Sequence, residues 1–260
     1  MQSVGRRCGT AIIIPSIDNR CYLEPCVRSI LLYTRGAPYH VYVVNNGASD
    51  SCHWIDLPDV SVFQADGNRG WEGGLQLGLD HSSEECVCFL NDDTLLPPSS
   101  ARWLAHMRAL LCGYARVGAV GPSSNYVSGP QSISFLHAAP VLSVRFLIGF
   151  CLLTTRAILA EVGGIWADAD GADDLDLSIR LRNARYMLLA DRTVFLHHHG
   201  AATGRRLYGD VWGPNGWYSP ARLMRHDTLL RDRHGDAAVD ELRELAQPVS
   251  WPDTGRAELA

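Results

Sequence analysis

Short apolar runs rich in β-branched residues alternate with segments of helical periodicity along the first ninety residues of this chain. Apolar runs that are bounded by turn residues are typical of buried parallel strands. The expected strands cover residues 10–15, 40–45, 60–64 and 86–90, and the expected helices cover residues 23–33 and about 73–81. This alternation predicts an α/β fold with a mainly parallel, doubly wound, Rossmann-like sheet and helices on both faces. Ligands of such folds bind at the carboxyl ends of the strands.

The second half of the chain is less regular. We expect a helix at about 99–111, a loop at 121–131, an apolar segment at 146–154 and a short helix that ends at Gly163 and Gly164. An acidic segment, 168–176, opens another helix, and two strands at about 186–190 and 193–197 precede a final helix at about 220–233. We expect one domain over residues 1–260, with a first half at about 8–120, a second half at about 121–204 and a C-terminal segment from about 205.

Composition excludes several classes of protein. All 23 basic residues are arginine, so the chain has no lysine for a P-loop, a kinase strand or a Schiff base. The net charge of −5 gives no basic footprint for sequence-specific binding of nucleic acid. No run approaches the roughly 20 apolar residues of a transmembrane helix, and the first residues lack a signal-peptide core. We therefore expect a cytoplasmic protein without a transmembrane segment.

Two adjacent carboxylates, Asp92 and Asp93, follow Asn91 at the end of the fourth expected strand. Adjacent carboxylates repel each other unless a cation or solvent absorbs the charge. A divalent ion that bridges to a diphosphate is the natural partner. The alternative is a solvated turn, because Asn-Asp-Asp-Thr is also good turn chemistry.

A glycine-rich stretch follows the third expected strand and opens a helix, with Asn68, Gly70, Gly73 and Gly74 as its key residues. Glycines let the backbone approach a ligand closely, and a helix N-terminus favours an anion. The alternative is a tight turn that allows close helix packing. G-x-G-x-x-G is absent, which argues against a dinucleotide-binding dehydrogenase.

A second acidic group lies in the segment 168–176 that opens the next expected helix. The apolar face of this helix extends back through position 174, so Asp174 is expected to point inward and to be able to take a proton from a hydroxyl group. The alternative interpretation, helix-start acids with a surface ion pair between Asp176 and Arg180, explains Asp176 better than Asp174.

Three consecutive histidines, His197, His198 and His199, end the last expected strand. Successive side chains of a strand point to opposite faces, so at least one imidazole is expected at the ligand edge, where it could complete a metal site begun by Asp93. A run of three histidines usually has exposed members, and a satisfied core histidine is the alternative.

Taken in chain order, these motifs resemble those of the bacterial family-2 glycosyltransferases, which are inverting enzymes of the GT-A fold. The resemblance runs from about residue 12 to residue 203. The segment I-I-I-P-S-I-D-N-R is similar to the first strand and turn of the family, which implies that Pro15, Ser16 and Asp18 lie at the nucleoside. V-V-N-N-G-A-S-D resembles the family segment whose aspartate reads the base, with Asn45 in place of that aspartate. G-P-S-S-N-Y-V-S-G-P-Q resembles a loop near the donor and acceptor.

The resemblance also implies roles for the later motifs. Asn91-Asp92-Asp93 stands where the family has its D-x-D motif, with Asn91 in place of the first aspartate, so Asp93 becomes the metal ligand. G-A-D-D-L-D-L-S-I-R is similar to the family's E-D-x-D-L-x-x-R, which makes Asp174 the general base and puts Asp173 where the family has glutamate. The late histidine motif selects His198 as metal ligand, with His197 and His199 as alternatives. The implied donor-binding residues are Pro15, Ser16, Asp18, Asn45, Asn68, Gly70, Gly73, Asn91, Asp92, Asp93 and Asp173.

The implied function is metal-dependent, inverting transfer of a sugar from a nucleoside-diphosphate sugar to an acceptor hydroxyl, with Mn²⁺ or Mg²⁺ as cofactor. The first half would bind the nucleotide sugar, the second half the acceptor, and the C-terminal segment would close the site. Glycan, protein, nucleobase and small molecule remain open as acceptors. The alternatives are a sugar-nucleotide-binding protein without turnover and a nucleotidyltransferase. Arg205, Arg206, Trp212 and Trp217 could cover the diphosphate, although surface arginines and packed tryptophans are the favoured interpretation.

Overall fold

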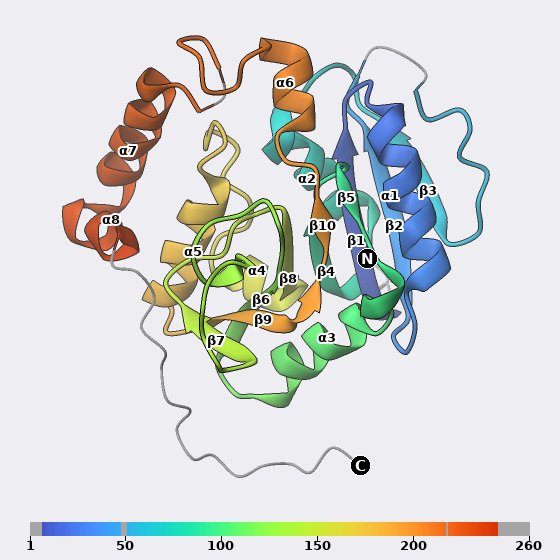
Figure 1. Ribbon diagram of the computed structural model, residues 1–260, viewed down its shortest axis with the longest axis horizontal. Helices are drawn as coiled ribbons and strands as arrows, with labels where there is room; N and C mark the ends of the chain where they lie inside the picture. Colours follow the sequence, from blue (N-terminus) through green and yellow to red (C-terminus); the bar gives the residue numbers. More distant parts are fainter. Residues whose placement is uncertain (1–6, 48–50, 217, 244–260) are drawn as a thin grey trace, which may run out of the picture.

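The computed structural model describes residues 7–47, 51–216 and 218–243, which form one large sheet covered by helices (Figure 1). The strands are β1 (Arg7–Ser16), β2 (Tyr39–Asn45), β3 (Val60–Gln64), β4 (Glu84–Leu90), β5 (Thr94–Leu95), β6 (Val117–Ser123), β7 (Val141–Val144), β8 (Cys151–Thr155), β9 (Met187–Phe195) and β10 (His197–His198). The α-helices are α1 (Arg20–Tyr33), α2 (Gly70–His81), α3 (Trp103–Gly113), α4 (Arg156–Glu161), α5 (Asp173–Asn183), α6 (Ala202–Tyr208), α7 (Pro220–His234) and α8 (Asp236–Arg243).

The sheet has the strand order β3-β2-β1-β4-β8-β6-β9-β7. All its neighbouring strands pair in parallel except at the contacts of β8 with β4 and β6 and of β7 with β9, which are antiparallel. The predicted mainly parallel α/β fold is therefore confirmed, with β7 and β8 running against the other strands. The sheet crosses both predicted halves of the chain, because β8, from the second half, lies between β4 and β6.

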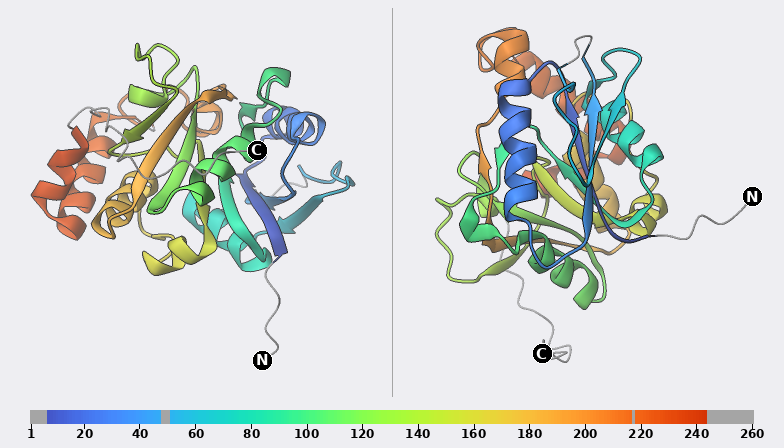
Figure 2. Two further views of the ribbon diagram at one scale, coloured as in Figure 1. Left: turned by 90° about the horizontal axis from the view of Figure 1, so that it is seen from below. Right: turned by 90° about the vertical axis from the view of Figure 1, so that its right-hand side faces the viewer.

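Helices cover both faces of the sheet, as the two views of Figure 2 show. The side chains of β1 alternate between the two faces: Ile12 and Ile14 belong to the core under α1 and α3, whereas Ala11 and Ile13 belong to the core under α2, α4 and α5. This alternation follows from the two-residue period of a strand. Burial on both faces explains why β1 is an almost unbroken apolar run.

Glycine sets the distance between α2 and β1. A Cβ atom at Gly78 would lie 2.3 Å from the Cγ2 atom of Ile13, and one at Gly74 would lie 2.8 Å from the Cβ atom of Pro15. These separations are far below van der Waals contact, so only glycine allows α2 to pack this closely. Pro15, predicted to lie at the nucleoside, is thus also a packing partner of α2.

Several predicted boundaries in the second half are wrong. The predicted loop at 121–131 begins inside β6, whose seven residues are all buried in the sheet. The two strands predicted at 186–190 and 193–197 are a single strand, β9, followed by the two-residue β10. No element was predicted for β7, α6 or α8. Glycine and proline in β6 have the signature of a turn, but the strand lies between β8 and β9, where small residues fit.

Two short strands outside the main sheet bring distant segments together. β5 pairs antiparallel with β10, so that Thr94 lies opposite His198 and Leu95 opposite His197. The pairing places the residues that follow β4 beside the late histidines. Within the described residues, no helix is long and apolar enough to cross a membrane.

Candidate active site

The β5–β10 ribbon places Asp93 against His198. The Nε2 atom of His198 lies 3.0 Å from the Oδ1 atom of Asp93, and both side chains are buried. The backbone N–H of Ala202, at the start of α6, donates to the other oxygen of Asp93. Burial acts to raise the pKa of Asp93, but the hydrogen bond and charge of His198 outweigh it and hold this pKa below its usual range.

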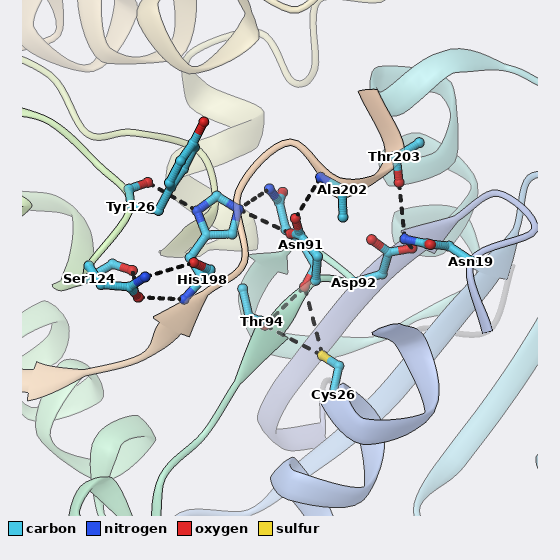
Figure 3. Close-up of polar contacts among 12 residues, drawn as sticks. Asn19, Cys26, Asn91, Asp92, Thr94, Ser124, Tyr126, His198, Ala202 and Thr203 are labelled. Carbon is cyan, nitrogen blue, oxygen red and sulfur yellow. Dashed lines mark hydrogen bonds and ion pairs between the residues drawn. The ribbon is translucent and has the colours of Figure 1, made fainter. Parts of the chain in front are cut away.

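The ring of His198 is oriented by its second nitrogen, Nδ1, which lies 3.2 Å from the backbone oxygen of Tyr126 (Figure 3). A carbonyl oxygen accepts only from a protonated Nδ1, and this contact is the usual support of a metal-binding histidine. The amide nitrogen of Asn91 lies 3.2 Å from Nε2. Within the described residues, Asp93 forms its ion pair with His198 and not with His197 or His199, and the ring of His199 instead lies near that of Tyr22.

The donor set of this pair suits a divalent cation. A carboxylate and an imidazole are common ligands of Mn²⁺, and the amide of Asn91 stands beside them. The described part of the chain holds no group of three or more His, Cys, Asp or Glu side chains placed to bind a metal. A cation at Asp93 and His198 would therefore need further ligands from a substrate or from water.

Asp92 faces the other way from Asp93. Its Oδ2 atom accepts hydrogen bonds from the Oγ of Ser16, at 2.6 Å, and from the Nδ2 of Asn19, at 3.1 Å. Burial raises the pKa of Asp92 to about 7 against the effect of these two bonds. Two predicted donor-binding residues, Ser16 and Asp92, thus meet where β1 and β4 end.

The two predicted residues near the end of β2 have protein partners. Asn45 is buried, and its amide nitrogen donates to the Oε1 of Gln64 at 2.7 Å. Asp18 has a positive φ of 48° and its side chain lies against Gly47, where a Cβ atom would meet the Asp18 Oδ1 at 2.3 Å. Asn45 therefore contacts a neighbouring strand, and a base-reading role would require its amide to exchange this partner.

The turn before α2 is shaped by two asparagines. The Oδ1 of Asn68 accepts from the backbone N–H of Gly70, which has a φ of +72°. The Nδ2 of Asn46 donates to the backbone oxygen of Gly70 at 2.6 Å, and its Oδ1 accepts from the N–H of Arg69. Gly73 lies in the first turn of α2, where a Cβ atom would meet the Cβ of Arg69 at 2.7 Å. Asn46 was missed by sequence reasoning, although it stands in the same Asn-Asn-Gly turn as Asn45.

The acidic pair at the start of α5 is held by three different segments. The indole N–H of Trp71, in α2, donates to Asp173 at 3.0 Å. The backbone N–H groups of Gly149 and Leu175 donate to the two carboxylate oxygens of Asp174, at 2.9 and 2.8 Å. Burial raises the pKa of both acids. Asp173 and Asp174 line a narrow pocket together with Trp71, Gly149 and Trp166.

A third carboxylate, Glu72, was missed by sequence reasoning. It is buried at the start of α2 and accepts from the backbone N–H of Gly171 at 2.7 Å. Burial raises its pKa, and its charge adds to the raised pKa of Asp173 and Asp174. The acidic group at the start of α5 therefore has members from two helices.

The interpretation of Asp176 as half of a surface ion pair is wrong. Asp176 does pair with Arg180, at 2.6 Å, but its side chain is fully buried. The reason is tertiary: α7 covers it, and Arg233 and His234 of that helix lie 2.9 and 2.8 Å from its second oxygen.

Residues 149 and 150 connect the two halves of the site. Gly149 binds Asp174, and the ring of Phe150 stacks on that of His198 with centroids 5.2 Å apart. The backbone N–H of Asn91 donates to the Phe150 oxygen at 2.9 Å. Asp93 and His198 do not line the pocket of Asp174, but they are joined to it through these two residues. Phe150 was not selected from the sequence, because a buried phenylalanine has no polar signature.

The chain is similar to known proteins, both in its sequence and in its fold. The model of the glycosyl transferase family 2 matches residues 11–129, a range that includes the C-terminal part of β1, all of β4 and the Asn91-Asp92-Asp93 motif. Residues 11–129 belong to this family. The predicted family resemblance is therefore confirmed over these residues, and the chain is a glycosyltransferase. The motifs of Asp174 and His198 lie outside the matched range. A search of curated proteins found no match.

Solved structures confirm the GT-A fold of the glycosyltransferase. The mannosyltransferase PcManGT from Pyrobaculum calidifontis, in complex with GDP-Man and Mn²⁺, is 18% identical, with 92% of this chain and 74% of that chain covered and a TM-score of 0.59. TarS (residues 1–349) from S. aureus is 13% identical, with 86% and 73% covered and a TM-score of 0.57. GalNAc-T7 with UDP, GalNAc and Mn²⁺ is 12% identical, with 73% and 43% covered and a TM-score of 0.59. At these identities the likeness concerns the fold alone.

Proposed function

We propose that this glycosyltransferase moves a sugar from a nucleoside-diphosphate sugar to an acceptor hydroxyl in one displacement, with inversion at the anomeric carbon and Asp174 as general base. The observation that carries the proposal is the connection of the Asp93–His198 pair to Asp174 through residues 149 and 150. The donor class is supported by proteins of the same fold, one solved with GDP-Man and Mn²⁺ and one with UDP, GalNAc and Mn²⁺.

Asp93 and His198 would hold Mn²⁺ or Mg²⁺, with the amide of Asn91 beside them. When bound, such a cation neutralises charge that builds on a departing diphosphate. The Nδ1 contact of His198 with the Tyr126 carbonyl leaves Nε2 as the ligating atom. The donor would lie along the carboxyl ends of β1, β2 and β4, where the structure describes Ser16, Asn45 and Asp92.

Asp174 would take the proton of the acceptor hydroxyl. The acceptor oxygen then forms a bond to the anomeric carbon while the bond from that carbon to the diphosphate breaks, and the electron pair leaves with the diphosphate. Two backbone N–H groups fix the direction of the Asp174 carboxylate, and burial raises its pKa toward neutrality. A general base is most effective when its pKa lies near the working pH.

The test of the base is an Asp174→Asn variant assayed with a panel of UDP- and GDP-sugars and Mn²⁺. We expect kcat to fall by about 10²- to 10⁴-fold, because general base catalysis contributes that much, while thermal stabilisation by the donor is kept. Asp168→Asn, which removes an exposed acid near the same helix, is the control. Undiminished turnover in Asp174→Asn would remove Asp174 from this role.

The test of the metal pair compares His198→Ala with His197→Ala. We expect Mn²⁺ to raise the thermal stabilisation by UDP or GDP in the parent protein and in His197→Ala, but not in His198→Ala. A ligand at 100 times its Kd stabilises a protein by about 2.7 kcal/mol, so the effect is measurable. An equal Mn²⁺ effect in both variants would contradict the assignment of His198.

A further inference from the structure

Two aromatic side chains that the proposed mechanism does not use, Trp212 and Tyr218, are stacked on each other. Their ring centroids lie 4.6 Å apart with an angle of 27° between the planes. The side chain of Trp212 is 63% exposed, whereas Tyr218 is half-buried. Both belong to the segment that joins α6 to α7 along the top of the molecule (Figure 1). The stack therefore leaves most of the Trp212 side chain open to solvent, supported by the ring of Tyr218.

The stack is built into a closed loop. The backbone N–H of Tyr218 donates to the oxygen of Val211 at 2.7 Å, and the N–H of Trp212 donates to the Asp210 side chain at 3.0 Å. Gly216 leaves no room for a side chain, since a Cβ atom there would lie 2.4 Å from the Val211 oxygen. The two rings are thus positioned before any ligand arrives.

Both ends of this segment are tied to the proposed active site. On one side, the first residue of α6, Ala202, donates its N–H to Asp93 at 3.1 Å. On the other side, Arg222 of α7 binds Asp170 through its backbone oxygen and its carboxylate, at 3.0 and 2.7 Å. Asp170 lies three residues before the acidic start of α5. The Trp212–Tyr218 stack therefore stands on the segment that spans from the metal pair to the general base.

Electrostatics agree with this placement. Burial raises the pKa of Tyr218, and the charges of Tyr126, Asp174 and Asp93 act in the same direction. Tyr126 in turn meets the ring of His198 edge-on at 5.8 Å, and the guanidinium of Arg205 lies 5.8 Å from its ring centre. The ring of Tyr126 therefore contacts both His198 and α6, the helix that precedes the segment of the stack.

The chemistry of this surface favours one kind of acceptor. A pyranose ring has a face of C–H groups that suits the negative face of an aromatic ring, and its edge carries hydroxyl groups. An acceptor with that shape can cover Trp212 and still present a hydroxyl to a carboxylate. We infer that the Trp212–Tyr218 stack is the acceptor subsite and that the acceptor is a carbohydrate. This inference rests on the proposed function, in which one hydroxyl of the acceptor loses its proton to Asp174.

The experiment measures transfer from the active nucleotide sugar to methyl glycosides of common hexopyranoses, to a phenol and to a serine peptide. For Trp212→Ala we expect the KM for the methyl glycoside to rise about 10-fold, because the variant lacks the exposed ring on which the sugar would stack, while the KM for the donor is unchanged. Tyr114→Ala removes an exposed aromatic side chain beyond the end of α3 and is the matched control.

The outcomes are separable. An acceptor KM that is the same in Trp212→Ala and Tyr114→Ala, with an active parent enzyme, overturns the inference and leaves the proposed function intact. Transfer to the phenol or the peptide but to no methyl glycoside overturns it as well. If no nucleotide sugar is consumed with or without acceptor, the proposed function fails and the inference fails with it. Saturation-transfer NMR on the methyl glycosides, lost in Trp212→Ala but kept in Tyr114→Ala, supports the subsite without relying on turnover.

Discussion

At the scale of single residues, the adjacent acids Asp92 and Asp93 show how partners decide chemistry. Both follow β4 and both are buried. Asp93 faces an imidazole and its pKa is lowered, whereas Asp92 faces a hydroxyl and an amide and its pKa is raised by burial to about 7. Neutral hydrogen-bond donors offset the lost hydration of a buried carboxylate less than a positive charge does. The sequence pattern alone does not distinguish the chemical environments of the two carboxylates.

The raised pKa of Asp92 predicts a pH-dependent effect of Asp92→Asn. Between about pH 4 and pH 7 the unfolded chain releases a proton that the folded chain keeps, so stability associated with Asp92 is lost as the pH rises through about 7. The amide of the variant cannot ionise. We expect Asp92→Asn to unfold at the same urea concentration as the parent near pH 4, and to be more stable by up to about 4 kcal/mol at pH 8.

This comparison is made by urea unfolding with EDTA present, because a bound cation would stabilise the ionised carboxylates. A difference between variant and parent that is constant from pH 4 to pH 8 would contradict the prediction.

At the scale of elements, close packing of α2 on β1 positions the glycine-rich turn. Gly74 and Gly78 face β1, so the N-terminus of α2 at Gly70, with Asn68 before it, is held at the carboxyl end of the sheet. The same helix supplies Trp71 to the acidic start of α5. A pattern interpreted as backbone freedom near a ligand is therefore also a requirement for helix-to-sheet packing.

Gly78→Ala tests the packing role. Helix propensity alone favours alanine by about 1 kcal/mol, but the new Cβ atom would lie 2.3 Å from Ile13, so we expect a net loss of about 1–3 kcal/mol in the free energy of unfolding. Gly113→Ala is the matched control. Gly113 ends α3 with no atom within 4 Å of its Cβ position, so we expect a gain of about 0.4–1 kcal/mol. Urea unfolding measures the free energy of unfolding of both variants. Equal destabilisation by Gly78→Ala and Gly113→Ala would count against the packing explanation.

At the scale of the whole molecule, a third and smaller core exists beside the two cores on the faces of the sheet. Its buried residues come mainly from α5, α7 and α8 and are Ala172, Ile179, Leu230, Val239 and Leu242. The buried carboxylate of Asp176 adds an ionic connection from α5 to Arg233 and His234 of α7. Helices α7 and α8 are thus anchored on α5, whose first turn contains the proposed base Asp174. The segment with Trp212 and Tyr218 directly precedes α7.

Asp176→Asn is expected to destabilise the protein by on the order of 3 kcal/mol, because it leaves Arg180 and Arg233 without their shared carboxylate. Asp232→Asn removes an exposed acid of α7, the helix that covers Asp176, and should change the free energy of unfolding by less than about 0.5 kcal/mol. Chemical unfolding gives the free energies, and hydrogen exchange of the α7 amides should quicken in Asp176→Asn alone. Equal midpoints for the two variants would show that the ionic connection contributes little.

Sequence reasoning found the β-α-β units of the first half because their patterns are local. Apolar β-branched runs, turn residues and helical spacing all act over fewer than about 15 residues, so 60–64 was predicted with the bounds that the structure has. The acids at 92, 93 and 174 and the three histidines were selected in the same way, from residue type and from the family resemblance. Strand β6 was missed since Val-Gly-Ala-Val-Gly-Pro-Ser has the local signature of a turn.

The tertiary structure alone decided which of these groups meet. The pairing of β5 with β10 brings the side chain of His198, and not those of its neighbours, to the carboxylate of Asp93, and α7 buries Asp176. It also placed Phe150 and Tyr126, which have no pattern of their own, against the ring of His198. The physical reason is range: backbone preference and side-chain periodicity are set by neighbours along the chain, whereas contact, burial and pKa depend on segments that are 50 to 100 residues apart or more.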